Sequence, residues 1–346
     1  MGQSLKQMEA QTEVTSGYSQ TKIKPNYLVS IQQNSRKTQE LLPEFQKIKL
    51  ADQDWMTTFL AAENSLTTDG CFGTFYLWGD AFGQMVAQTG NRLLLYYDVP
   101  EQPFFAYPAG SGSLEPAIRS MERKAAAAGT TLVIKGVTEQ QKEDLEAERP
   151  GYFEFVESRA NADYIYEVET LATLAGRKLH GKRNHCHRFE QSWPDWRFEK
   201  LERAHFPQCM ALLDHWVENH VEQAVDIQTA ERFALERAFA DYENLNLEGG
   251  ALFVGAKLVA FTIGEPVSTN GFDIHFEKAM TEFGGAYPMV NREFVRHLKS
   301  CYPGLRYINR EEDLGLENLR RAKESYQPAF ILKKYIARCA SENRNE

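Results

Sequence analysis

Three ionisable residues alternate with large apolar residues in the segment FDIHFEKA at 272–279. In a β-strand this spacing places Asp273, His275 and Glu277 on one face of the strand and the apolar residues on the other. The apolar residues are Phe272, Ile274 and Phe276. Imidazole and carboxylate groups are the usual general bases, and burial beside other charges moves their pKa values toward neutrality. His275 or Glu277 could therefore deprotonate an attacking nucleophile.

The same three residues have an equally good structural interpretation. They could form a buried network of hydrogen bonds and ion pairs with a nearby cation. The candidate cations are Lys278, Arg292 and Arg310. A second polar run, NREED at 309–313, extends this pattern, because Asn309 and Glu311 alternate and should share a strand face. We expect that face to lie close to His275 and Glu277, while Asp313 caps the helix that follows.

A basic segment, GRKLHGKRNHCHR at 176–188, holds five Lys or Arg residues and no acid, in a chain whose net charge is −9. Guanidinium and ammonium groups bind phosphate, so this segment is a candidate for holding an anionic substrate. The candidate contacts are Arg177, Lys178, Lys182, Arg183, Asn184 and Arg188, together with Arg310 of the second polar run. The alternative is a solvated face of a connecting helix.

Composition limits what else the protein can be. The 346 residues give a prior of two domains, and the net negative charge argues against sequence-specific DNA binding or general attraction of nucleic acid. Five cysteines without a Cys-x-x-Cys pair indicate reduced thiols, and we expect a cytoplasmic protein without a signal peptide or membrane span. His185, Cys186, His187, His205 and Cys209 lack paired ligand spacing, so we expect no metal site there.

The elements that must position these residues follow one order twice. Each half predicts strands, a Gly-containing loop, a helix, a strand, a second helix and a final strand. The loops are AGSGS at 109–113 and TEFGGAY at 281–287. We predict a polar tail at 1–38, α/β domains at 39–168 and 169–340, and a polar tail at 341–346, each domain with a mixed, mostly antiparallel sheet and helices on both faces.

This order resembles the GNAT acyltransferase fold, and several segments resemble an uncharacterised bacterial family grouped with the C-terminal domain of phosphatidylglycerol lysyltransferases. The segments that carry the resemblance include GAYPMVNREF, YINREEDLGLENLRRAKESYQP and ILKKY. The resemblance covers residues from about 60 to 340. It implies two tandem GNAT-like domains, related to the Fem peptidyltransferases.

The resemblance also implies roles for individual residues. GNAT enzymes hold the pyrophosphate of CoA at a loop that corresponds to Gly284, Gly285, Ala286 and Tyr287 here, although Glu282 replaces a residue that usually favours phosphate. The first-half loop at 109–113 is its counterpart. Many GNAT enzymes also place a tyrosine that protonates the leaving group at the position of Tyr326; the alternative for Tyr326 is simple packing.

Together these observations predict a transferase that moves an acyl or aminoacyl group to an amine. Acyl-CoA and aminoacyl-tRNA are the two candidate donors, since ordinary GNAT enzymes use the first and the lysyltransferases and Fem enzymes use the second. The alternative is a ligand-binding or scaffold protein built on GNAT domains that have lost the donor site.

Overall fold

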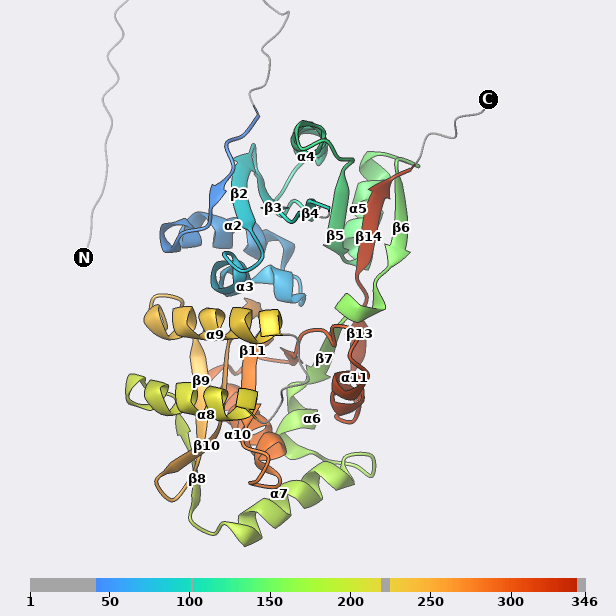
Figure 1. The fold of residues 1–346 in the computed structure, drawn as a ribbon. Helices are drawn as coiled ribbons and strands as arrows, with labels where there is room; N and C mark the ends of the chain where they lie inside the picture. Colours follow the sequence, from blue (N-terminus) through green and yellow to red (C-terminus); the bar gives the residue numbers. More distant parts are fainter. Residues whose placement is uncertain (1–41, 101, 219–224, 341–346) are drawn as a thin grey trace, which may run out of the picture. The chain divides into compact units, whose positions relative to one another are not determined.

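The computed structural model describes residues 42–100, 102–218 and 225–340. The predicted tails at 1–38 and 341–346 lie outside the described residues. Two seven-stranded sheets organise the described chain, with helices packed on both faces of each (Figure 1). The predicted α/β class with two mixed, mostly antiparallel sheets is confirmed.

The first sheet contains one parallel pair, β4 with β5, among antiparallel neighbours. In spatial order its strands are β1 (Gln46–Lys47), β2 (Gln84–Thr89), β3 (Arg92–Tyr97), β4 (Phe104–Ala106), β5 (Val133–Val137), β14 (Tyr335–Cys339) and β6 (Phe153–Glu157). Its helices are α2 (Gln53–Glu63), α3 (Phe72–Trp78), α4 (Glu115–Ala127) and α5 (Glu139–Glu148).

The second sheet also contains one parallel pair, β11 with β12. In spatial order its strands are β13 (Phe330–Leu332), β7 (Asp163–Glu167), β12 (Tyr307–Asn309), β11 (Gly271–Ala279), β10 (Lys257–Ser268), β9 (Glu248–Val254) and β8 (Trp196–Lys200). Its helices are α6 (Val168–Thr173), α7 (His180–Ser192), α8 (Phe206–Glu218), α9 (Val225–Ala240), α10 (Ala286–Cys301) and α11 (Glu317–Glu324).

The two sheets exchange strands. β7, from the first half of the sequence, pairs with β12 and β13 in the second sheet, and β14, at the end of the chain, pairs with β5 and β6 in the first. The single final strand expected in the second half is therefore two strands, β13 and β14, in different sheets. A boundary at residue 168 does not separate the sheets, because pairing partners at a sheet edge are chosen by the tertiary fold and not by chain order.

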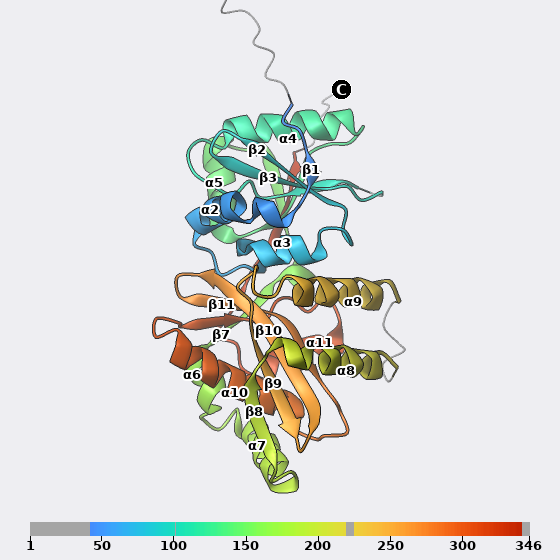
Figure 2. The same ribbon diagram turned by 90° about the vertical axis from the view of Figure 1, so that its left-hand side faces the viewer.

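One hydrophobic core joins the two sheets, which belong to a single structural unit. Residues of α2 and α3 pack with residues of α8 and α9, and the core includes inward faces of both sheets, such as Leu95 of β3 and Phe261 of β10. Figure 2 shows α3 and α9 between the sheets. The outer faces have separate cores, with α4 and α5 on the first sheet and α6, α7 and α10 on the second. Side chains on the α3 face of the second sheet are consequently buried.

Candidate active site

A β-bulge divides the three ionisable residues of β11. The register shifts where Ile263 pairs with Phe276 but Gly264 pairs with Ile274, so that His275 has no partner on β10. Phe272 and Ile274 pack toward α10, whereas Phe276 packs in the core that contains α3. The strict alternation predicted for this strand is therefore wrong beyond His275, because a bulge adds one residue and reverses the faces that follow.

The bulge creates two separate polar clusters. Asp273 and His275 face α3, where they meet residues of the first half of the chain. Glu277 instead contacts Asn291 of α10 and Arg310, on the opposite face of the sheet. Glu311 does lie beside His275, as predicted, but Glu277 does not. The alternation of the sequence could not reveal this, because a bulge leaves the pattern of residue types unchanged.

We name the first group the His275 cluster; it comprises Cys71, Glu265, Asp273, His275 and Glu311. The imidazole Nε2 lies 2.9 Å from Glu265 Oε1, and Nδ1 lies 3.3 Å from Glu311 Oε1 and 3.4 Å from Asp273 Oδ2. Burial opposes the charged ring, but hydrogen bonds to Cys71, Glu265 and Glu311 outweigh it and hold the pKa of His275 well above its ordinary value. Carboxylates thus lie at both nitrogens of the buried ring.

A network of fixed partners surrounds this cluster. Asp163 Oδ1 lies 2.9 Å from Lys334 Nζ, and Asp163 Oδ2 accepts hydrogen bonds from Thr68 N at 3.0 Å and from Asn309 Nδ2 at 3.2 Å. Asn309 Oδ1 in turn accepts from the backbone N–H of Glu311 at 2.6 Å. Asn309 thus holds the backbone of the loop after β12 in place.

We name the second group the Arg310 cluster; it comprises Tyr166, Lys182, Glu277, Arg310 and Tyr326. Arg310 Nη2 donates to Glu277 Oε1 at 2.7 Å, and the guanidinium carbon lies 4.6 Å from the centroid of the Tyr326 ring. Lys182 Nζ lies 3.9 Å from the same centroid. Arg310 Nη1 is buried and has no hydrogen-bond partner among the described residues. The cluster therefore presents an unused donor on Arg310, beside a second cation, Lys182, and the ring of Tyr326.

Burial sets the protonation of two members of the Arg310 cluster. It lowers the pKa of Lys182 to about 8, with repulsion from Arg310 in the same direction. It also raises the pKa of Tyr326 far above its ordinary value. Tyr326 is buried and packs in the hydrophobic core on the α10 face of the second sheet. At neutral pH the phenol is protonated and the amine is charged.

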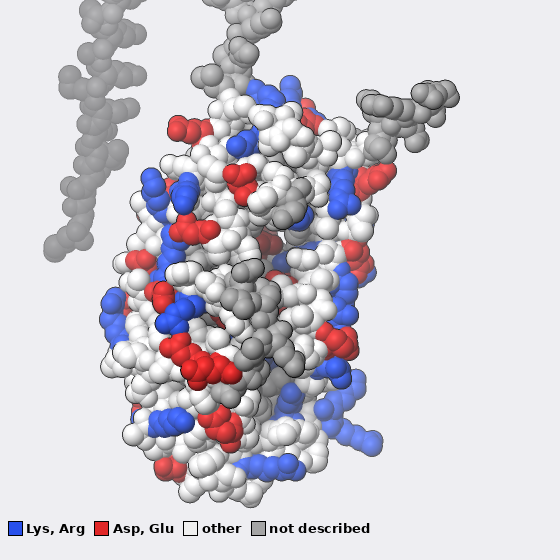
Figure 3. Space-filling view, in the orientation of Figure 1, with Lys and Arg blue, Asp and Glu red and all other residues white. Residues whose placement is uncertain are grey.

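The basic segment divides into structural and exposed residues. Arg183 donates to the backbone carbonyls of Leu174 and Gly176 and so closes the turn between α6 and α7. Asn184 contacts His180 one turn earlier, at 3.4 Å. The exposed members are Arg177, Lys178 and Arg188, and Lys182 reaches the Arg310 cluster. In Figure 3, Lys and Arg side chains gather at the lower right, where Figure 1 places α7 and α11.

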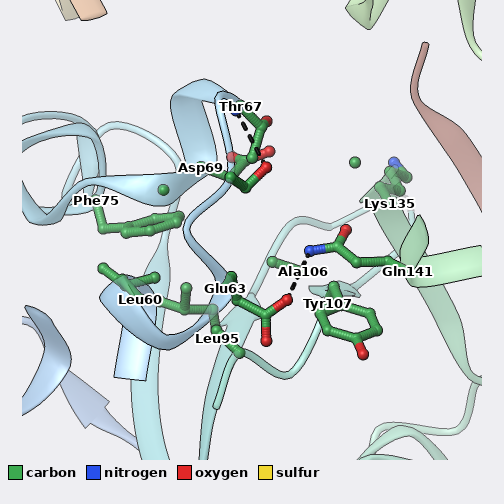
Figure 4. A pocket seen from close by; sticks show the side chains of 14 residues that line it. Leu60, Glu63, Thr67, Asp69, Phe75, Leu95, Ala106, Tyr107, Lys135 and Gln141 are labelled. Carbon is green, nitrogen blue, oxygen red and sulfur yellow. Dashed lines mark hydrogen bonds between the residues drawn. The ribbon is translucent and has the colours of Figure 1, made fainter. Parts of the chain in front are cut away.

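Carboxylates occupy the donors of the first-half glycine loop. Gly110 N donates to Glu63 Oε1 at 3.0 Å, while Leu114 N and Glu115 N donate to Glu148 at 3.2 and 3.1 Å. Figure 4 shows Glu63 facing Gln141 in the hollow beside this loop. The hollow has a volume of about 20 Å³, which is room for about one water molecule. The N–H groups of Gly110 and of the helix start after the loop thus donate to carboxylates of the protein itself.

The second-half loop is partly covered by α7. A Cβ on Gly285 would stand 2.5 Å from the carbonyl oxygen of His185, so the backbone of α7 packs directly on this glycine, whose φ is 98°. Ala286 is buried, and Tyr287 accepts a hydrogen bond from Trp216 Nε1 at 2.9 Å. Gly284, by contrast, has open space around it. The missing side chain of Gly285 thus allows the backbone of α7 to pack on the loop that was predicted to bind phosphate.

Several residues in and around the His275 cluster were not expected from the sequence. Thr68, Cys71 and Asp163 come from the first half, and Glu265 and Lys334 from the second. A signal existed for Glu265, the one acid in the apolar run LVAFTIGEPV of β10. The cysteines and histidines considered for zinc are scattered: Cys209 is in the core, and His187 pairs with Glu190 at the surface.

Comparison with known proteins gives a family match over most of the chain. The model of the family described as "Phosphatidylglycerol lysyltransferase, C-terminal" matches residues 63–338. An uncharacterised protein of Mycoplasmoides gallisepticum is 24% identical over 183 residues, which are 52% of this chain and 56% of that protein. The chain thus spans about half the length of the curated relative that it matches.

Solved structures share the fold. A conserved protein of unknown function from Bacteroides thetaiotaomicron is 37% identical, with a TM-score of 0.80 over 86% of this chain and 100% of that chain. The C-terminal domain of a putative lysylphosphatidylglycerol synthetase from Agrobacterium fabrum is 14% identical, with a TM-score of 0.58 over 84% and 92%. FemX is 10% identical, with a TM-score of 0.56 over 85% and 96%. These likenesses show that the chain shares the fold of the lysylphosphatidylglycerol synthetase domain and of FemX, as the predicted relation to the lysyltransferases and Fem enzymes implies. Among the described residues, no helix is long and apolar enough to cross a membrane.

Proposed function

The chain belongs to the phosphatidylglycerol lysyltransferase C-terminal family, and we propose on that premise that it transfers an aminoacyl group from aminoacyl-tRNA to an amine acceptor. The observation that carries the proposal is Nη1 of Arg310, which is buried without a partner in the described part of the chain and lies in a cluster with Lys182 and Tyr326. A buried donor without a partner costs free energy, so its retention is explained when a substrate oxygen supplies the acceptor.

The basic segment connects this donor to a surface suited to tRNA. Arg177, Lys178 and Arg188 are exposed around the start and outer side of α7, and Lys182 of the same helix turns inward to Tyr326. Phosphate contacts of this kind position a nucleic acid without reading its sequence. We infer that the exposed cations hold the acceptor end and that Lys182 contacts its terminal phosphate.

The glycine loops favour aminoacyl-tRNA over acyl-CoA as the donor. At the first loop Glu63 and Glu148 accept hydrogen bonds from N–H groups that a pyrophosphate would need. At the second, α7 packs on Gly285, and Glu282 lies 3.1 Å from His215 Nε2. A carboxylate repels pyrophosphate and already satisfies the backbone donors that would bind it.

The proposed transfer needs one base, one acid and one donor to the carbonyl oxygen. The amine attacks the ester carbonyl, a C–N bond forms, and the bond to the ribose 3′-oxygen breaks. Arg310 Nη1 holds the carbonyl oxygen, Glu277 accepts the proton of the amine, and Tyr326 donates a proton to the departing oxygen. His275 has no part in this scheme, because it lies on the other face of the sheet.

Single-turnover transfer of a radiolabelled aminoacyl group from tRNA to an added amine tests the proposal. Tyr326→Phe and Arg310→Lys should lower the transfer rate by roughly 100-fold each, as expected when a preorganised donor is removed. Lys47→Ala, an exposed change on β1 of the other sheet, should leave the rate unchanged. Binding of tRNA without transfer to any amine would favour the ligand-binding alternative, and binding of neither donor would favour a scaffold.

A further inference from the structure

We propose that the Nδ1 side of the His275 cluster binds one divalent transition-metal ion, Mn²⁺ or Zn²⁺, with Asp273, His275 and Glu311 as its protein ligands. These residues lie on the face of the second sheet opposite the Arg310 cluster. The inference is therefore independent of the proposed transfer reaction, and its test measures binding of the ion alone.

The charges around His275 favour a bound divalent ion. Glu265, Asp273 and Glu311 place three carboxylates around one imidazole, and the side chains of His275 and Asp273 are fully buried. In the described part of the chain, no Lys or Arg lies within 4.0 Å of these carboxylates. If all three carboxyl groups are ionised, a protonated imidazole supplies one positive charge against three negative ones, and unpaired charge in a low-dielectric interior is strongly unfavourable. A divalent ion beside a neutral ring reduces the excess to one negative charge.

The spacing of the donor atoms around Nδ1 also favours a shared ion. The Nδ1 distances to Glu311 Oε1 and Asp273 Oδ2 are 3.3 and 3.4 Å, and the three atoms lie within 4.8 Å of one another. Atoms bound at about 2.1 Å to one ion, at right or tetrahedral angles, are about 3.0–3.4 Å apart. Hydrogen bonds between charged groups are shorter, at about 2.7–2.9 Å. The spacing on the Nδ1 side therefore fits a shared ion better than direct hydrogen bonds.

The two nitrogens of the His275 ring differ in their distances to neighbouring carboxylates. Nε2 lies 2.9 Å from Glu265 Oε1, the distance of a strong hydrogen bond. Metal-binding histidines usually donate the N–H of the other nitrogen to a carboxylate, which fixes the tautomer and leaves the first nitrogen free for the metal. Glu265 is placed to act as this outer partner, so the lone pair of Nδ1 points to the side of Asp273 and Glu311.

Two further observations support a ligand at this position. Asp273 Oδ1 is buried, in a residue with no exposed surface, and has no hydrogen-bond partner within the described ranges. Glu311 has a φ of 55°, which is strained for a non-glycine residue, and Asn309 holds its backbone N–H at 2.6 Å. The Glu311 side chain is 26% exposed, which provides a route for the ion from solvent. Thr68 Oγ1 donates to Asp273 Oδ2 at 2.8 Å and orients that carboxylate.

The donor set selects among ions. One imidazole nitrogen with carboxylate oxygens suits Mn²⁺ and Zn²⁺, whereas Mg²⁺ prefers oxygen ligands alone and keeps its water. The test titrates chelator-treated full-length protein with each of the three chlorides at one fixed pH and measures affinity by calorimetry. We expect one site for Mn²⁺ or Zn²⁺, with binding of Mg²⁺ at least roughly tenfold weaker.

Glu311→Gln removes one ligand charge at the partly exposed position and should weaken binding by roughly tenfold or more. Glu312→Gln, the same change one residue later, is the matched control and should bind as the unchanged chain does. Circular dichroism of both variants verifies that they fold. The proposal is overturned if neither Mn²⁺ nor Zn²⁺ binds the folded protein, or if Glu311→Gln binds them as tightly as Glu312→Gln does.

Discussion

Lys182 Nζ lies 3.9 Å from the centroid of the Tyr326 ring, which joins the basic segment of α7 to the turn that follows α11. Arg310 packs on the same ring, and burial is the main reason that the pKa of Lys182 falls to about 8. The charge that would contact a tRNA phosphate is thus lost a little above neutral pH. Arginine at the same position would keep its charge throughout this range.

The first prediction follows from this pKa. Binding of tRNA should weaken as the pH rises through about 8, because Lys182 loses its proton there. A bound phosphate favours the charged amine and moves the midpoint upward. In Lys182→Arg, the affinity should fall much less over the same pH range. Fluorescence anisotropy of labelled tRNA at constant ionic strength measures both profiles; parallel profiles would show that Lys182 does not contact the RNA.

Stability should show the opposite dependence on pH. The unfolded chain releases the proton of Lys182 at its ordinary pKa of 10.5, whereas the folded chain releases it at about 8. Between these values the unfolded state binds more protons, so folding stability contributed by this residue rises with pH. Urea unfolding at several pH values should show this rise in the wild type but not in Lys182→Met. Equal slopes for the two proteins would contradict the assigned environment.

The exposed cations should determine the salt dependence of tRNA binding. Replacing Arg177 and Lys178 together by Ala should reduce the slope of log affinity against log salt by about 0.7–0.9 for each phosphate that these side chains neutralise. Arg183→Ala should instead lower stability by about 1 kcal/mol, because Arg183 donates to backbone carbonyls of the α6–α7 turn. An unchanged slope in the double variant would remove this surface from the tRNA site.

Gly73 should tolerate no side chain. A Cβ at this position in α3 would stand 1.9 Å from Glu265 Oε1, which is held by His275. Gly73→Ala should therefore destabilise the fold by about 1–3 kcal/mol through overpacking. Gly181→Ala is the matched control, since Gly181 lies in α7 with open space around it and alanine favours the helix by up to about 1 kcal/mol. Thermal unfolding compares the two, and equal melting temperatures would contradict the close approach of Glu265 to α3.

The carboxylate of Glu148 should behave as a cap and not as a barrier that can be removed to restore CoA binding. It accepts from Leu114 N, Glu115 N and Ser113 Oγ. Glu148→Ala should cost about 1–2 kcal/mol of stability, as the loss of a helix N-terminal acceptor does. Acetyl-CoA should not raise the melting temperature of the wild type or of this variant. A rise in the variant alone would identify a CoA site that Glu148 had closed.

The sequence predicts the elements that carry the site better than it predicts their contacts. The helix of the basic segment and the polar strand at 272–279 follow from hydrophobic periodicity, which is a local property. The bulge at His275 and the stacking of Phe276 on Trp78 are tertiary features, which local periodicity does not record. For this reason Glu277 is on the face opposite to the one expected.

Residues distant in sequence were the hardest to predict. Cys71 and Asp163 meet the His275 cluster because the two halves share one core and exchange strands. No spacing in the sequence records that Asp163 pairs with Lys334, 171 positions away. The family resemblance pointed to the fold, but only the contacts of Arg310 and Lys182 divide the candidate residues into two sites.

A measurement of aminoacyl transfer itself tests the proposed function most directly. Purified protein is mixed with tRNA that carries a radiolabelled aminoacyl group, together with an amine, and the labelled amide is separated after a single turnover. We expect that the amide forms, that Tyr326→Phe and Arg310→Lys slow its formation, and that acetyl-CoA neither replaces the tRNA nor competes with it. Acetyl transfer from acetyl-CoA, with no aminoacyl transfer from tRNA to any amine, would contradict the proposed function.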